Sequence, residues 1–132
     1  MNRPLIAMLS LLLLTGCVKP PNPGRADPYP MGQISFADDQ LARLTAVGTP
    51  LVSRPAETNL LTVTVPVRSA SRRRLFVEYQ GLFFDDSGNE IDRTAWMNKT
   101  LEPNVQDVVS VRSINPKASN FRIAFRYARM DP

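Results

Sequence analysis

The chain has 132 residues, with 16 lysines and arginines against 12 aspartates and glutamates, a net charge of +4, one cysteine and no histidine. Its length suits a single domain, and the missing histidine excludes a Ser-His-Asp triad, a Cys-His pair and the commonest metal ligand. A single cysteine forms neither an internal disulfide nor a cysteine-based zinc site. We therefore expect no metal, no cofactor and no enzymatic activity.

The first sixteen residues predict a signal peptide. Arg3 precedes the apolar run PLIAMLSLLLL at residues 4–14, which is shorter than the about 20 apolar residues that a membrane-spanning helix needs. The run ends in Leu14-Thr15-Gly16-Cys17, which resembles the lipobox of bacterial lipoprotein precursors. This resemblance implies cleavage between Gly16 and Cys17 and acylation of Cys17, for example with palmitate. The alternatives are an ordinary signal peptide with an incidental cysteine, or a buried apolar helix.

The residue after the cysteine predicts where the protein is sorted. An aspartate at this position in lipoproteins of this class favours retention in the inner membrane, and here the residue is Val18. Its pattern resembles that of lipoproteins sent to the outer membrane. We therefore expect a protein anchored by lipid to the periplasmic face of the outer membrane.

Residues 17–33 form the acylated cysteine and a proline-rich tether. Five of the twelve prolines of the chain fall here: Pro20, Pro21, Pro23, Pro28 and Pro30. Because proline fixes φ and lacks a backbone N–H, this segment predicts polyproline II or coil. Sixteen such residues extend by roughly 50 Å, which suits a spacer between membrane and domain. A proline-rich recognition peptide is the alternative.

Apolar and polar residues alternate over residues 34–132, which predicts a β-domain. The predicted signal peptide places this domain in the periplasm. Residues 36–44 favour either a helical turn capped by Asp38 or Asp39, or the approach to the first strand. Strands are expected at 47–53, 61–67, 75–84, 90–98, 105–111 and 121–127, with turns at 85–90, 103–104 and 115–117. Pro50 suits a sheet edge, and Gly81 suggests a bulge or a central strand.

Six or seven strands at this spacing, without a long helix, favour an all-β antiparallel sandwich. Large apolar side chains are available for its core. We expect the core to contain Phe83, Trp96, Phe121, Phe125 and Tyr127.

Several stretches resemble the YcfL-like lipoproteins of Gram-negative bacteria, a family of unknown function. They are VGTPLV at 47–52, LTVTVPVR at 61–68, VEYQGLFFD at 77–85, GNE at 88–90, Trp96 and NPKASNFRI at 115–123. The family has a tryptophan near the positions of Leu82 and Phe83, which this chain lacks. The resemblance implies an immunoglobulin-like β-sandwich of about six to seven strands facing the periplasm, and it supplies no catalytic or binding residue.

The acidic turn at residues 85–90, Asp-Asp-Ser-Gly-Asn-Glu, offers several oxygen ligands. An EF-hand calcium loop needs its glycine at the sixth position, a bidentate glutamate at the twelfth and flanking helices. Here the glycine is at the fourth position. We expect a turn and no metal site.

The densest positive cluster consists of Arg72, Arg73 and Arg74. Arg122 and Arg126 would add a basic stripe if the polar face of the last strand is solvated. Such a patch could contact anionic lipid headgroups, glycan carboxylates or an acidic protein. A solvated hairpin loop is the alternative, and nucleic acid is not expected because the signal peptide directs the protein out of the cytoplasm.

The sequence therefore predicts a lipoprotein that is held in the membrane by the lipid on Cys17 and acts as a non-catalytic binding or scaffold module. The expected partner is another envelope protein or peptidoglycan. An exposed edge strand, at 47–53 or at the end of the chain, would suit binding by backbone pairing. The alternative is an accessory subunit of a cell-envelope machine, either a regulator of peptidoglycan synthesis or a component of a secretion assembly.

Overall fold

The computed structural model of the chain describes residues 32–129. The predicted signal peptide, Cys17 and all but the last two residues of the predicted tether lie outside this part. The described chain contains, in order, β1 (Ile34–Phe36), α1 (Asp39–Leu44), β2 (Thr45–Val47), β3 (Leu51–Ser53), β4 (Thr62–Ser69), β5 (Leu75–Phe84), β6 (Glu90–Arg93), β7 (Met97–Leu101), β8 (Asp107–Arg112) and β9 (Asn120–Tyr127).

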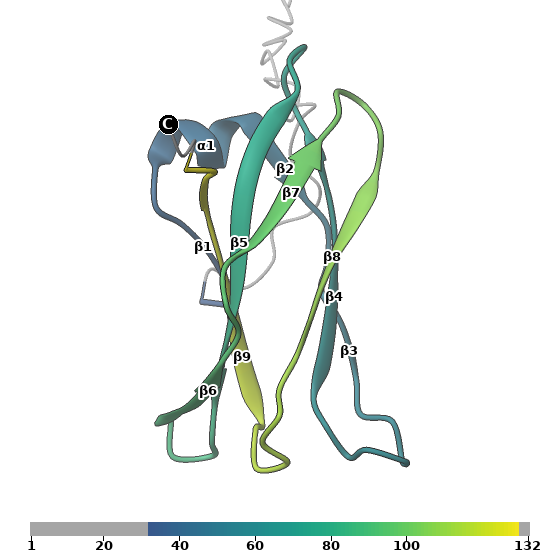
Figure 1. The fold of residues 1–132 in the computed structure, drawn as a ribbon, viewed down its shortest axis with the longest axis vertical. Helices are drawn as coiled ribbons and strands as arrows, with labels where there is room; N and C mark the ends of the chain where they lie inside the picture. Colours follow the sequence, from purple (N-terminus) through teal and green to yellow (C-terminus); the bar gives the residue numbers. More distant parts are fainter. Residues whose placement is uncertain (1–31, 130–132) are drawn as a thin grey trace, which may run out of the picture.

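The strands form two sheets that face each other (Figure 1). The first sheet has the order β1-β9-β5-β6. Strand β7 also belongs to it: β6 and β7 follow each other along the same edge of β5. In the second sheet β4 is central, with β8 along one edge and β2 and β3 along the other. The expected all-β sandwich is confirmed. It differs from the expectation in its larger number of short strands and in β1, which pairs with β9 in parallel.

The longest strands are those whose sequences alternate most clearly. Along β4 every second side chain, from Val63 to Ser69, is buried while those between are partly exposed. In β9 the buried residues are Phe121, Ile123 and Phe125. Because side chains on a strand alternate between its two faces, one face of each sheet supplies the core.

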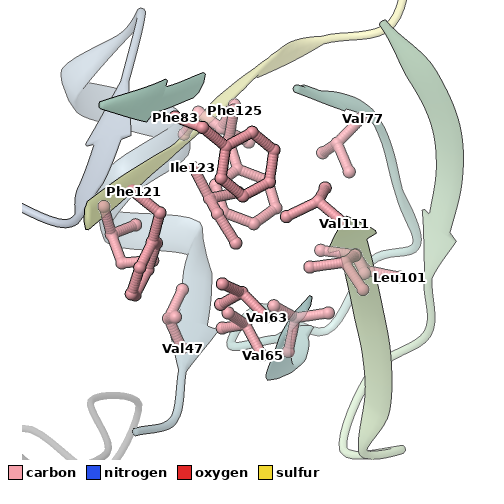
Figure 2. Close-up of a cluster of buried hydrophobic side chains, with 14 of the residues drawn as sticks. Val47, Val63, Val65, Val77, Phe83, Leu101, Val111, Phe121, Ile123 and Phe125 are labelled. Carbon is pink, nitrogen blue, oxygen red and sulfur yellow. The ribbon is translucent and has the colours of Figure 1, made fainter. Parts of the chain in front are cut away.

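The core lies between the sheets (Figure 2). Val77, Phe83, Ile123 and Phe125 come from the first sheet, and the second sheet contributes valines of β4 and β8. Phe36 of β1 stacks on Phe125, with ring centroids 5.3 Å apart. Burial of these apolar side chains is the main driving force for the fold.

Two of the expected core aromatics lie elsewhere, which corrects the prediction. Trp96 is only partly buried, because it follows β6 and stacks on the guanidinium of Arg126, 3.9 Å from its ring. Tyr127 is exposed at the end of β9. Both lie where a strand ends or is interrupted, so the alternation that predicted their burial no longer applies.

The short helix α1 takes the first of the two predicted alternatives for residues 36–44. Asp38 has extended backbone angles and its carboxylate accepts from the N–H groups of Gln40 and Leu41, at 2.7 and 3.0 Å. This is the bonding of an N-terminal cap. Leu41 is fully buried, so the helix covers one end of the core.

Two predicted single strands are each divided in the structure. In the segment 47–53, β2 ends at Val47 and β3 begins at Leu51. The N–H of Gly48 still donates to the Pro66 carbonyl of β4 at 2.8 Å, and the pairing is interrupted at Thr49 and Pro50. Both parts lie on the predicted sheet edge. The segment 90–98 is divided into β6 and β7, and its interruption at residues 94–96 lets Trp96 leave the strand.

Gly81 lies in the middle of β5. This strand is hydrogen-bonded along both edges, so it is a central strand, which was one of the two predictions for this glycine. The register of β5 with β6 shifts between Phe83 and Phe84. A second irregularity lies at Gly81, because Gln80 and Gly81 face the three residues 94–96 between the pairs Tyr79–Met97 and Leu82–Arg93. A Cβ at position 81 would lie 2.8 Å from the Cβ of Val111 in the opposite sheet. The glycine is therefore explained by the close approach of the two sheets.

Within residues 32–129, no helix has the length and hydrophobicity to cross a membrane.

Candidate functional site

The arginine loop, residues 69–74, connects β4 to β5 at the end of the sandwich that also carries α1 (Figure 1). The hydroxyl of Ser69 is fully buried at its centre. It donates to the carbonyl of Arg73 at 2.7 Å and accepts from the N–H of Ser71 at 3.2 Å. The hydroxyl of Ser71 in turn accepts from the N–H of Arg73 at 3.0 Å. Two serines thus fix the path of the loop.

Backbone hydrogen bonds attach this loop to the rest of the domain. The N–H of Ala70 donates to the carbonyl of Leu44 at the end of α1, at 2.7 Å, and the N–H of Ser69 donates to the carbonyl of Glu102 after β7, at 3.3 Å. Because ordering a loop costs conformational entropy, a loop already fixed in the free protein binds without that cost.

Three consecutive arginine side chains project from this fixed backbone. Arg74 forms an ion pair with Glu102, with Nε 2.7 Å from Oε1. Arg72 and Arg73 are exposed and form no ion pair with any residue of the described part. Arg43, in the last turn of α1, is next to the Leu44 carbonyl that holds the loop. This end of the sandwich is therefore rich in positive charge.

Arg126 on β9 is neutralised within the domain. Its Nε lies 2.5 Å from a carboxylate oxygen of Glu78 on β5, and both side chains are mostly buried. Trp96 covers its guanidinium, which adds a cation–π contact. Glu78 lies on β5 and Trp96 lies between β6 and β7, so local sequence did not reveal these partners.

Arg122, also on β9, is exposed and has no carboxylate partner in the described part. Its Nε donates to the carbonyl of Gly32 at 3.1 Å, and its guanidinium carbon lies 5.7 Å from the centre of the Phe84 ring. Arg122 pairs with Leu82, eight residues along β5 from Arg74, which corresponds to about 26 Å. The five predicted arginines therefore form no single patch: three lie in the arginine loop, and two lie apart from it on β9.

The predicted sheet edge is exposed. The side chains of Leu51 and Val52 in β3 are 64% and 54% exposed, and β3 pairs only with β4. Pro50 and Pro55 flank it, and Arg54 donates hydrogen bonds to the carbonyls of residues 59, 116 and 118. The edge is short and held at one end by this arginine.

The segment 85–90 forms the predicted turn. The carboxylate of Asp85 accepts from the N–H groups of Ser87 and Asn89, at 2.9 and 3.0 Å, and Gly88 has a φ of 82°. These are the bonds of a turn stabilised by an aspartate. Among residues 32–129, no group of three or more Asp, Glu, Cys or His side chains is arranged to hold a metal ion.

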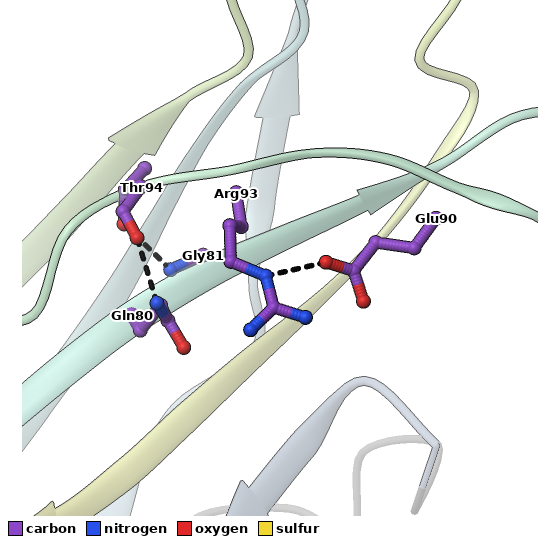
Figure 3. A network of polar contacts seen from close by, with 5 residues as sticks. All are labelled: Gln80, Gly81, Glu90, Arg93 and Thr94. Carbon is purple, nitrogen blue, oxygen red and sulfur yellow. Dashed lines mark hydrogen bonds and ion pairs between the residues drawn. The ribbon is translucent and has the colours of Figure 1, made fainter.

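Two ion pairs lie on β6 to β8. The hydrogen bond from Lys99, followed by that from the N–H of Val108, holds the pKa of the Asp107 carboxyl below its usual range. Hydrogen bonding to Glu90 raises the pKa of Arg93 (Figure 3). Beside this pair, the amide of Gln80 donates to the carbonyl of Thr94 at 2.7 Å, and the hydroxyl of Thr94 accepts from the Gly81 N–H (Figure 3).

The sequence profile of a family described as "Protein of unknown function (DUF1425)" matches residues 34–127. The chain belongs to this family. The match spans the domain from β1 to β9, so the DUF1425 region and the sandwich are the same unit. No curated protein matches the chain.

Two solved structures share the fold of this DUF1425 domain. The crystal structure of Campylobacter jejuni cj0090 is similar with a TM-score of 0.61 and 13% identity, over 74% of this chain and 99% of that one. The crystal structure of a DUF1425 family member from Shewanella sp. pv-4 is similar with a TM-score of 0.57 and 19% identity, over 66% of this chain and 81% of that one. At these identities the comparison concerns the fold alone.

Proposed function

We propose that the protein is a lipoprotein anchored through Cys17 to the periplasmic face of the outer membrane, and that its domain is a non-catalytic module that binds peptidoglycan. The arginine loop carries the binding part of this proposal. Ser69 and Ser71 fix its backbone, and Arg72 and Arg73 are exposed without a carboxylate partner in the described chain. Guanidinium groups bind carboxylates with directed hydrogen bonds, and peptide stems of the wall carry carboxylates.

The anchor and tether support the same proposal. The reach of roughly 50 Å expected for a fully extended tether exceeds the length of the sandwich from Arg122 to Arg74, about 26 Å along β5. The loop can therefore turn toward the wall or back toward the membrane. A Cys17→Ala variant should leave the membrane fraction, and its recovery in that fraction would contradict lipid anchoring.

Binding to isolated sacculi tests the loop. In a pelleting assay, the double variant Arg72→Ser/Arg73→Ser should bind about tenfold more weakly than the wild type, since each exposed charge pair contributes up to about 1 kcal/mol. The matched control is Arg112→Ser/Lys117→Ser, which removes the same charge from exposed positions away from the loop. Equal losses in both variants would indicate a general charge effect and would contradict the proposal.

Anionic phospholipid vesicles form the second arm of this test. If the double variant loses binding to vesicles containing phosphatidylglycerol but binds sacculi like the wild type, the loop is a membrane contact and peptidoglycan is the wrong partner.

A second candidate function is that of an accessory subunit of an envelope machine. The exposed edge β3 favours it, because an unpaired edge can accept a strand of another protein, and Leu51 and Val52 offer apolar contacts there. A photo-crosslinker at position 51, used in intact cells, should then give one reproducible protein adduct. Position 57, in the exposed loop beyond β3, is the control.

A further inference from the structure

A hollow of about 450 Å³ opens where the described chain begins. Its walls come from residues 32–33, the end of β5, the turn at Gly88 and the start of β9. Sites for small ligands are concave, with apolar walls and a few polar groups, and this hollow has both. The arginine loop is not part of it.

Arg122 supplies the positive charge of the hollow. Its Nε is held by the carbonyl of Gly32, and its guanidinium lies near the ring of Phe84. In the described chain, no hydrogen bond or ion pair occupies its two terminal nitrogens. Arg126 on the same strand is instead paired with Glu78. Arg122 is thus positioned but not neutralised, and its fork of N–H donors suits a carboxylate.

The other residues that line the hollow indicate which chemical groups of the ligand lie next to its carboxylate. Phe84, which is partly exposed, provides aromatic surface, whereas the side chain of Phe121, which also borders the hollow, is buried in the core. The amides of Gln33 and Asn120 add polar groups, and the carbonyl oxygen of the Asn120 side chain already accepts from the N–H of Phe121, which leaves its NH₂ group as a donor. One arginine balances one negative charge, so a monoanionic carboxylate fits better than a phosphate dianion.

We propose that this hollow binds the carboxylate end of a short peptide, with the carboxylate on Arg122, the adjoining amide on Asn120 or Gln33, and a small apolar side chain against Phe84. The chemistry is shared by the carboxyl terminus of a protein, which ends in an L-residue, and by a peptide stem of the wall, which ends in a D-residue. The inference does not depend on the arginine loop, because the two sites share no residue.

Titration of the full-length protein in detergent with acetylated dialanine tests this site, with chemical shifts of the protein as the readout. The peptide with a free carboxylate should bind at least tenfold more tightly than its amide, because a charged hydrogen bond is lost in the amide. The L- and D-terminal forms of the peptide distinguish the two sources. No binding at millimolar peptide, or equal binding of the amide, would overturn the proposal.

Substitutions of residues that line the hollow test whether the peptide binds there. Arg122→Met should weaken binding of the free peptide about tenfold or more and remove the preference over the amide, while Arg112→Met, an exposed arginine on β8, should change neither. Phe84→Leu should weaken both peptides alike. If Arg122→Met binds like the wild type with an unchanged melting temperature, the site is wrong. Arg72→Ser/Arg73→Ser should bind the peptide normally, so failure of the sacculus assay leaves this test intact.

Discussion

The close approach of the two sheets at Gly81 allows the change in stability of a Gly81→Ala variant to be predicted. In a Gly81→Ala variant, the new Cβ would lie 2.8 Å from Cβ and 2.9 Å from Cγ2 of Val111, where carbon atoms normally stay about 3.5–4.0 Å apart. Such overpacking costs about 1–3 kcal/mol, and alanine recovers about 0.5–1 kcal/mol of backbone entropy relative to glycine. The difference is a net loss of about 0–2.5 kcal/mol in the free energy of unfolding, with a middle value of about 1 kcal/mol.

A double-mutant cycle separates this clash from other effects. Val111→Ala alone should cost about 2 kcal/mol by leaving a cavity. It also removes the two methyl groups 2.9 and 3.1 Å from the new Cβ but keeps the Val111 Cβ at 2.8 Å, so it relieves the clash in part. The double variant should therefore be more stable, by about 0.5 kcal/mol or more, than the sum of the single losses predicts. Urea unfolding, followed by the fluorescence of Trp96, the single tryptophan, gives all three values.

The result that would refute this reasoning is additivity. If the two losses simply add, the sheets do not approach as closely as the distances indicate.

Three further predictions concern polar contacts. Ser69→Ala removes the buried hydroxyl bonded to the Arg73 carbonyl, so we expect a loss of about 1–3 kcal/mol in urea unfolding and weaker sacculus binding with every arginine retained. Arg126→Met leaves the mostly buried carboxylate of Glu78 unpaired, so thermal melting should show a loss of about 1–3 kcal/mol. The pKa of Asp107 is lowered in the folded state, so the unfolded state binds more protons in acid, and stability should fall as the pH drops from about 5 toward 3. Asp107→Asn should show a smaller fall in urea titrations over this range.

Each of these has an outcome that would contradict it. Normal sacculus binding by Ser69→Ala would mean that the loop need not be fixed in advance. Arg93→Met breaks an exposed pair and should change stability by less than about 0.5 kcal/mol, so an equal loss in Arg126→Met would contradict the importance of burial. Identical acid titrations of the wild type and Asp107→Asn would mean that the contact with Lys99 does not persist in solution.

Local sequence patterns predicted the long strands and the helix cap. In β4 and β9 the alternation is uninterrupted, and each strand is paired along most of its length, so periodicity and burial agree. Asp38 was one of two expected caps, and its carboxylate bonds within three residues of itself. Such features depend only on neighbours in the chain.

The remaining features depend on contacts between distant residues. The parallel pairing of β1 with β9 joins residues about ninety positions apart. The sequence of a three-residue strand does not indicate which strand it pairs with. For the same reason the partners of Arg126 could not be predicted, since Glu78 and Trp96 reach it only after β5 and β9 have paired. Of the predicted site, the loop could be read from three consecutive arginines, whereas its serine core required the structure.

The pairing of β1 with β9 also sets the order in which the domain can form. β9 is the last strand along the chain, and it lies between β1 and β5 in the first sheet. Until residues 120–127 are available, β1 has no strand to join and β5 lacks the neighbour along one of its two edges. A chain emerging from its amino terminus therefore cannot complete the first sheet before residues 120–127 have emerged.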